Sequence, residues 1–245
     1  MIEMLGVLAI IGVLSVGGIA GYSKAMLKYK TNKLIDGVTM LTTNIRTLYA
    51  QQDDFTGLDV TNALDMGVVP DELDNSTYNN GTRTTAALTN PFSGTTTINT
   101  TYSVKGTAGA DRAFVIGVTG IPKEACMAMA TADWGSNYSS GLIGMAITNQ
   151  SGVGSGVNTT GENPTEIKGD TAAALLITDG SANGIYAGVD CTTTKVATSK
   201  MGGATGTKNQ NTGKYCAKDL PIKVAEAAAG CNCDGSNCSF AIKYY

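Results

Sequence analysis

The chain has 245 residues, a formal net charge of −3, 42% hydrophobic residues, 15% charged residues and no histidine. A charge this close to zero gives no basis for binding nucleic acid, and no specific nucleic-acid binding is inferred. Without histidine, Ser-His-Asp and Cys-His triads are excluded and the commonest metal ligand is missing. The hydrophobic fraction is too high for a disordered chain. We therefore expect a folded protein that is not an enzyme and that holds no cofactor and no metal.

An uncharged apolar run opens the chain. Residues 4–22 contain no charged side chain, which is about the length that a helix needs to cross a bilayer, and Glu3 stands directly before them. A carboxylate beside a membrane span is costly unless it is paired or functional. No basic residue precedes the run, as one would in a secretory signal peptide, so we expect the run to belong to the working protein.

The helical pattern continues beyond the apolar run. Apolar residues recur at helical spacing at Leu27, Leu34, Val38, Leu41, Ile45 and Leu48. Four lysines, which are Lys24, Lys28, Lys30 and Lys33, cluster where the run ends and suit a lipid headgroup surface. We predict one helix over residues 1–52, about 75 Å long, with 1–25 as a transmembrane or filament-core part and 26–52 as an amphipathic part.

Residues 53–245 are predicted to form a single disulfide-bonded α+β head with an antiparallel sheet. Turn-forming residues follow one another from Asp53 to about Thr100, which indicates a long structured loop. Runs of β-branched and aromatic residues predict strands at 101–105, 112–118, 142–148, 173–178, 185–189 and 239–245. Helices are predicted at 121–130 and 224–229, and exposed Gly-, Thr- and Asn-rich loops at 149–170 and 198–214.

An even set of six cysteines in an exported chain indicates disulfides, and six cysteines allow 15 connectivities. They are Cys126, Cys191, Cys216, Cys231, Cys233 and Cys238. Two metal sites remain as alternatives, a thiolate site in the 231–238 cluster and a calcium loop at Asp71, Glu72 and Asp74. Glycosylation sequons occur at Asn75, Asn80, Asn99, Asn137 and Asn158.

The segment Ile-Glu-Met-Leu-Gly-Val-Leu-Ala-Ile-Ile-Gly-Val-Leu at residues 2–14 resembles the N-terminus of a processed type IV pilin or pseudopilin. The resemblance implies a trimmed, N-methylated mature chain in which Glu3 neutralises the N-terminal amine of an adjacent subunit. It also implies subunit packing through the apolar residues Leu5, Val7, Leu8, Ile10, Ile11 and Leu14. Pilin filaments have a melted helical segment near this place, and here the weak helix formers are Ser15, Gly17, Gly18 and Gly21. The same small residues could instead allow close helix packing.

Two stretches further along, residues 64–70 and residues 90–94, resemble the link between helix and sheet in type IVb pilins. The match departs at Thr95, where that class has a second glycine. The class ties a mid-chain helix to the segment before the last strand, which implies a Cys126–Cys231 disulfide. Our preferred set adds Cys191–Cys216, which would close a loop of low apolar content, and Cys233–Cys238, which would span a turn sequence. Cys231 and Cys233 could exchange roles.

The resemblance implies a structural subunit that polymerises into a type IV pilus on a bacterial surface and supports adhesion, aggregation or motility. Its expected partners are further copies of the chain, inner-membrane lipid before assembly and the pilus assembly machinery. The subunit is expected in the inner membrane before assembly and in the extracellular pilus, or fimbrium, afterwards. There are two alternatives: a pseudopilin of a type II secretion-like system, and a monomeric membrane-anchored adhesin. The exposed surface loops expected within residues 149–215 argue against the pseudopilin.

Overall fold

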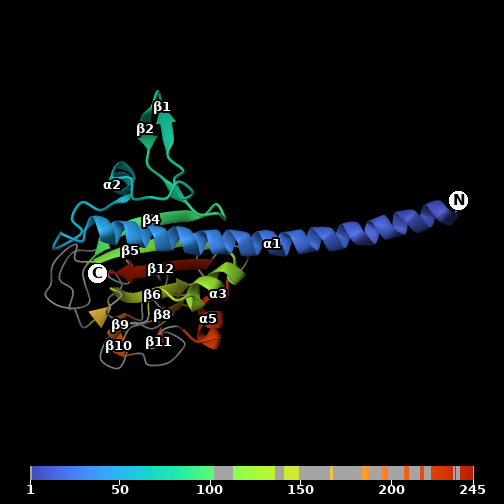
Figure 1. Ribbon diagram of the computed structural model, residues 1–245. Helices are drawn as coiled ribbons and strands as arrows, with labels where there is room; N and C mark the ends of the chain where they lie inside the picture. Colours follow the sequence, from blue (N-terminus) through green and yellow to red (C-terminus); the bar gives the residue numbers. More distant parts are fainter. Residues whose placement is uncertain are drawn as a thin grey trace.

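A computed structural model describes residues 2–101, 113–135, 141–148, 222–233, 235 and 238–244, together with five short strands between residues 166 and 217. The chain is α+β, as predicted: a long N-terminal helix leaves a head that is built around an antiparallel sheet (Figure 1).

The N-terminal helix α1 spans Ile2–Leu48 without a break, and its first half projects from the head as a free rod (Figure 1). The helix ends four residues before the predicted boundary at residue 52. After Leu48 the chain tightens, because the Ala50 amide donates to the Thr47 carbonyl and the Gln52 amide donates to the Tyr49 carbonyl. The Tyr49 ring then lies against Phe55, with ring centroids 5.2 Å apart, which turns the chain back onto the head.

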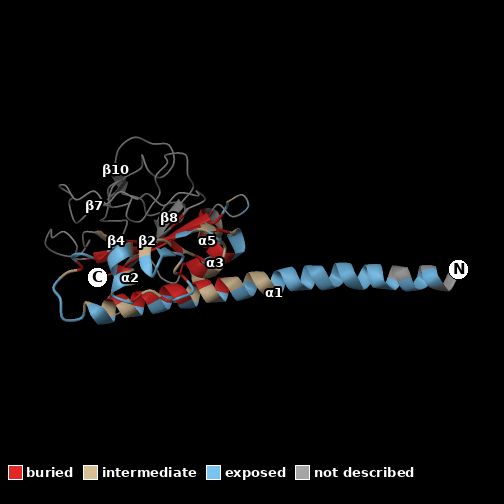
Figure 2. Cartoon of the chain, turned by 90° about the horizontal axis from the view of Figure 1, so that it is seen from above, coloured by how far each residue is buried: buried red, intermediate tan, exposed pale blue. Residues whose placement is uncertain are grey.

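The head is organised around a seven-stranded sheet in the order β11-β8-β6-β12-β5-β4-β3. Its strands in the described residues are β3 (Leu88–Thr89), β4 (Thr95–Thr101), β5 (Ala113–Ile121), β6 (Leu142–Thr148), β8 (Gly184–Ala187), β11 (Cys216–Ala217) and β12 (Cys238–Tyr244). Neighbouring strands are antiparallel except for β11 and β8, which are parallel. The C-terminal half of α1 lies along one face of this sheet in both views (Figures 1 and 2). Buried residues, red in Figure 2, gather where the helix meets the sheet, and they form the core of the head.

Two short helices accompany α1 at the end of the head from which the rod leaves (Figure 1). They are α3 (Lys123–Thr131), which contacts α1 and β12, and α5 (Val224–Gly230), which contacts α3. Both were predicted, and Pro122 stands at the N-cap of α3 with an extended backbone. β5, β6 and β12 were also predicted, to within a few residues at their ends.

The stretch expected to be a long loop contains five regular elements. They are α2 (Val60–Asp65), the hairpin of β1 (Thr77–Asn79) and β2 (Thr82–Thr85), and the sheet strands β3 and β4. The hairpin projects from the head as a separate two-stranded sheet (Figure 1). A third, three-stranded sheet joins β7 (Glu166–Ile167), β9 (Lys195–Ala197) and β10 (Thr207–Asn209), and both β7 and β10 lie in stretches predicted as loops. Residues 102–105 and 173–178, predicted as strands, lie outside the described residues.

Candidate functional site

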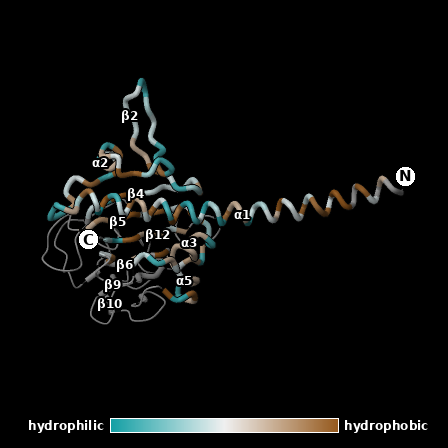
Figure 3. The backbone as a smooth tube through the Cα atoms, in the orientation of Figure 1, coloured by the Kyte–Doolittle hydropathy of each residue, from teal (hydrophilic) through white to brown (hydrophobic). Residues whose placement is uncertain are grey.

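The projecting half of α1 is apolar and exposed along its whole described length (Figures 2 and 3). Val13, Val16 and Ile19 are 75%, 72% and 67% exposed. Such an apolar surface on a helix requires lipid or other helices around it. Among the described residues α1 is the one helix that is long and apolar enough to cross a membrane.

Four of the residues predicted to take part in subunit packing lie on this surface. Val7, Ile10, Ile11 and Leu14 are between 54% and 69% exposed. Glu3, Leu5 and Leu8 lie in the helix, but their side chains are outside the described residues. The single subunit thus presents an uncovered apolar helix face at the positions predicted for assembly.

The predicted opening segment, Ser15–Gly21, is regular α-helix in the single subunit. The Ser15 hydroxyl donates a hydrogen bond of 2.7 Å to the Ile11 carbonyl, one turn back. A Cβ atom built on Gly17, Gly18 or Gly21 would meet no other atom within 4 Å. These glycines therefore lower helix propensity without serving any contact within the subunit.

A basic and aromatic segment separates the exposed rod from the head. Tyr22 and Tyr29 are 67% and 61% exposed, and Lys24 and Lys28 are exposed as well. Lys30 instead turns to the head, where its ammonium lies 5.8 Å from the centre of the Phe92 ring. The lysines were noticed in the sequence, whereas the two tyrosines were missed, although an aromatic residue beside a membrane span is a known interfacial signal.

The second half of α1 is held by the head along the predicted stripe. Leu34, Val38, Leu41 and Ile45 are fully buried, while Leu48, at the end of the stripe, is 44% exposed. The head therefore holds α1 by its second half only, and the first half is uncovered. Any load applied to the rod is therefore carried into the head through this stripe.

A chain of aromatic rings closes the end of the head that lies far from the rod. Phe55 lies 4.8 Å from Phe114, and Phe114 lies 5.7 Å from Tyr244, measured between ring centroids. The Tyr244 hydroxyl donates to the Trp134 carbonyl at 3.0 Å. Burial raises the pKa of Tyr244 to about 12, even though the Arg46 guanidinium, 5.8 Å from the ring centre, lowers it. Burial likewise raises the pKa of Tyr49, helped by the charge of Asp59.

The 90–94 segment forms a clamp between the preceding loop and β5, and the buried Asn90 side chain is at its centre. The Asn90 side chain donates to the Thr119 carbonyl at 2.7 Å and accepts from the amides of Phe92 at 2.8 Å and Gly94 at 3.2 Å. A Cβ on Gly94 would lie 1.8 Å from the Thr119 carbonyl oxygen, so no side chain fits there. Ser93 has φ +68°, a left-handed conformation that costs a serine energy. The clamp fixes the loop to the sheet beside Lys30.

Two disulfides lie in the described part of the head. Cys126 of α3 is bonded to Cys231 after α5, with Cα atoms 5.7 Å apart, and Cys233 is bonded to Cys238, with Cα atoms 5.4 Å apart. These are two of the three preferred pairs. The third, Cys191–Cys216, falls outside the residues that can be described in full. Since Cys231, Cys233 and Cys238 are all oxidised, the alternative of a thiolate metal site in this cluster is wrong.

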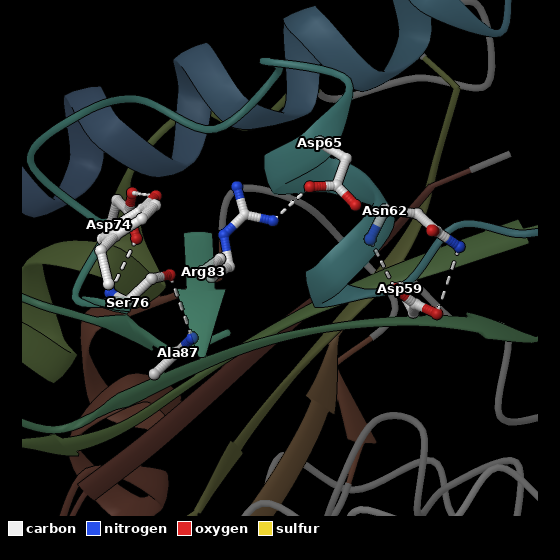
Figure 4. A network of polar contacts seen from close by, with 8 residues as sticks. Asp59, Asn62, Asp65, Asp74, Ser76, Arg83 and Ala87 are labelled. Carbon is white, nitrogen blue, oxygen red and sulfur yellow. Dashed lines mark hydrogen bonds and ion pairs between the residues drawn. The ribbon is translucent and has the colours of Figure 1, made fainter. Parts of the chain in front are cut away.

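The projecting hairpin is tied to α2 by a polar network (Figure 4). Arg83 of β2 forms an ion pair with Asp65 of α2 and lies 5.7 Å from the centre of the Tyr78 ring. The Asp74 carboxylate accepts from the Ser76 amide at 2.8 Å and from the Tyr78 hydroxyl at 3.3 Å. Burial alone would raise the pKa of Asp74, but these hydrogen bonds and the charge of Arg83 together lower it. No signal in the sequence pointed to this network, because Arg83 and Asp65 are 18 residues apart.

The remaining predicted sites are a calcium loop and the glycosylation sequons. Within the described residues no group of three His, Cys, Asp or Glu side chains could hold a metal ion, and this includes the carboxylates of Asp71, Glu72 and Asp74. Asn80 is at the exposed tip of the hairpin, with φ +49°. The other sequon residues lie at the start of the hairpin segment (Asn75), in β4 (Asn99) and outside the described residues (Asn137 and Asn158).

The chain is similar to known pilus subunits. A family model described as Bundlin matches residues 25–174. A major structural subunit of bundle-forming pilus from Escherichia coli O127:H6 (strain E2348/69 / EPEC) is 29% identical over 174 residues, which are 70% of this chain and 76% of the relative. A second protein of that description, from Escherichia coli O111:H-, is 29% identical over 139 residues, which are 56% of this chain and 65% of the relative.

Two solved pilin structures are also similar to the chain. A type IV b pilin from Salmonella typhi has a TM-score of 0.42 and 13% identity over 87% of this chain and 97% of its own. TcpA, a type IV pilin from Vibrio cholerae El Tor biotype, has a TM-score of 0.43 and 11% identity over 89% of this chain and 99% of its own. The matched family region begins at residue 25, after the apolar run.

Proposed function

This chain belongs to the Bundlin family, and on that premise we propose that it is a structural subunit that polymerises into a type IV pilus on a bacterial surface. Its two relatives are described as major structural subunits of bundle-forming pilus, which favours a pilus over the pseudopilin and the monomeric adhesin. The polymer supports adhesion, aggregation or motility. The chain has no catalytic role in this proposal.

One observation carries the mode of assembly: a helix that is packed on the head along its second half and exposed and apolar along its first half (Figures 2 and 3). Association of apolar surface is favourable by about 25 cal/mol for each Å² removed from water. We assign residues 1–25 to lipid before assembly and to the filament core afterwards, and residues 26–52 to the head. The assembly machinery would move the subunit from the inner membrane to the extracellular fimbrium.

Within that core, Glu3 is proposed to pair with the N-terminal amine of an adjacent subunit. An unpaired carboxylate in a low-dielectric core is costly, and a good ion pair recovers much of that cost. The pair would also set the axial register of one subunit on the next. The neighbouring apolar residues from Leu5 to Leu14 would fill the space between helices.

The experiment is electron microscopy of cells that express Glu3→Ala. Such cells should keep the protein in the membrane but form no filaments, or irregular ones. Asp36→Ala is the matched control, since Asp36 is an exposed carboxylate on the same helix, within the head. Normal filaments from Glu3→Ala would refute the role of Glu3, whereas absence of filaments from the unaltered chain would refute the pilus assignment itself.

The segment Ser15–Gly21 is proposed to open when the filament is extended. Four glycines between residues 12 and 21 weaken the helix by about 1 kcal/mol each relative to alanine, and none has a contact within the subunit that a side chain would disturb. Opening would lengthen the subunit and let the filament yield to load. An unbroken helix from Glu3 to Leu48 in a filament map would contradict this proposal while leaving the subunit role intact.

A further inference from the structure

The segment between the rod and the head spans the boundary at residue 25, and the assembly described above assigns no contact to its side chains. We call Tyr22, Lys24, Lys28 and Tyr29 the collar, because all four are exposed on α1 just before the head begins at the buried Thr31. The chain has no carboxylate between Glu3 and Asp36, so the only charges in the collar are the positive charges of its two lysines. Neither Lys24 nor Lys28 forms an ion pair with any carboxylate among the described residues.

The position of the collar along α1 matches the edge of a bilayer. The uncharged run of residues 4–22 is about 28 Å long as a helix, close to the roughly 30 Å of a hydrocarbon core. When this run spans the membrane, the collar enters the headgroup layer. Tyrosine and lysine are residue types that favour this layer, because an apolar body can stay near the acyl chains while a polar end reaches the headgroups.

The collar lies on the side of the membrane where lysine is normally scarce. The head carries the Cys126–Cys231 and Cys233–Cys238 disulfides, which form outside the reducing cytoplasm. Since α1 is continuous from the run into the head, the collar is on the same side as the disulfides. Lysines beside a span are normally concentrated on the cytoplasmic side, so these lysines oppose the usual orientation signal. Two ammonium groups at this place are suited to an anionic ligand in the headgroup layer.

The directions of the collar side chains favour lipid over a single protein neighbour. At about 100° per residue, Lys24 and Lys28 are about 40° apart around the helix axis, Tyr22 and Tyr29 are about 20° apart, and the centres of the two pairs are about 130° apart. A headgroup layer surrounds the helix and meets both pairs, whereas one neighbouring subunit would cover one side.

We propose that the collar binds the phosphate groups of anionic phospholipids in the headgroup layer next to the head, and thereby sets the height of the stored subunit in the membrane. The inference rests on the proposed function, since it needs a subunit held in the membrane by residues 4–22. The ammonium groups of Lys24 and Lys28 donate to the phosphate oxygens, and the two tyrosines hold the helix at that depth.

The test is electron paramagnetic resonance with spin-labelled phosphatidylglycerol and phosphatidylcholine on the full chain, reconstituted in vesicles that contain both lipids. The unaltered chain should prefer phosphatidylglycerol by about fivefold or more at low ionic strength, and salt should reduce the preference. K24Q/K28Q should bring the ratio close to one, and K24R/K28R should restore it. Unchanged Trp134 fluorescence would show that the head of each variant is folded.

Equal association of the two lipids with the unaltered chain, or an undiminished preference in K24Q/K28Q, would overturn the inference. Loss of filaments in K24Q/K28Q without any change in lipid preference would also overturn it, and would assign the collar to a second copy of the chain. Electron microscopy of the same strains separates the two proposals: failure of the unaltered chain to form filaments bears on the pilus role, and the lipid ratio bears on the collar.

Discussion

Replacing Gly94 with alanine should destabilise the head, because the site has no space for a methyl group. The new Cβ would lie 1.8 Å from the Thr119 carbonyl oxygen and 2.8 Å from the Asn90 side-chain nitrogen. Those two atoms form the 2.7 Å hydrogen bond of the clamp, so relieving the clash breaks this bond. Each buried donor or acceptor left unpaired costs about 1–3 kcal/mol. With both groups affected, the free energy of unfolding should fall by about 3–5 kcal/mol.

The measurement is urea unfolding of the full chain in detergent micelles, followed by the fluorescence of Trp134. This tryptophan is buried in the head, 5.5 Å from the Phe240 ring, and is the only one in the chain. Gly37→Ala is the matched control: its Cβ would meet the Leu73 side chain at an ordinary 3.5 Å, and alanine favours a helix by about 1 kcal/mol. A Gly94→Ala protein within about 0.5 kcal/mol of the unaltered chain, or a control that falls equally, would refute the reasoning.

Ser93→Gly should raise the free energy of unfolding by about 1 kcal/mol, because glycine adopts φ +68° freely; an unchanged urea midpoint would contradict this. Cys126→Ser/Cys231→Ser should lower the free energy of unfolding by about 4 kcal/mol, since the disulfide closes a loop of 105 residues. A loss below about 1 kcal/mol in the same assay would count against this prediction. Burial raises the pKa of Tyr244 from 10.0 to about 12, so the folded head favours the protonated side chain. This contribution to the stability of the head is present in full below pH 10 and is lost as the pH rises to about 12. The loss amounts to about 3 kcal/mol, and Tyr244→Phe should remove this decline from urea midpoints measured across that range; an equally steep decline in the variant would disprove it.

The elements that the sequence predicted well are those with a clear apolar period. The stripe from Leu34 to Ile45 matches the buried face of α1, and the apolar runs of β5 and β12 match two central strands that are almost entirely buried. Burial on both faces produces a continuous hydrophobic run, which is easy to recognise.

The elements that were missed have no such period. β4 is Thr-Thr-Thr-Ile-Asn-Thr-Thr, and its inward positions Thr96 and Ile98 are both buried, but threonine on both faces conceals the alternation. α2 has six residues and forms because the Asp59 side chain accepts from the Asn62 amide, a single capping bond that leaves little trace in sequence. The projecting hairpin depends on Asn80 and Gly81 in left-handed conformations, a turn sequence that we included in a loop.

Some features of the candidate site could be predicted from the sequence, and others depend on the fold. The exposed apolar rod and the lysines at its end could be predicted, because an uncharged run of this length predicts an apolar helix that the head does not cover. The Asn90 clamp could not be derived, because its meaning depends on the Thr119 carbonyl, 29 residues away in the chain. Spacing likewise cannot show which cysteines meet, since that depends on how α3 and α5 come together.

The place of β12 in the sheet determines when the head can fold. This strand, residues 238–244, pairs with β5 on one side and β6 on the other, so a strand that is synthesised after both of its neighbours fills the centre of the sheet. Before these residues cross the membrane, β5 and β6 each have an unpaired edge, and unpaired edges invite aggregation. The N-terminal rod can enter the bilayer long before that moment. In the membrane-stored subunit proposed above, the rod would tether the nascent chain while its head is still open, and would keep it from diffusing away unfolded.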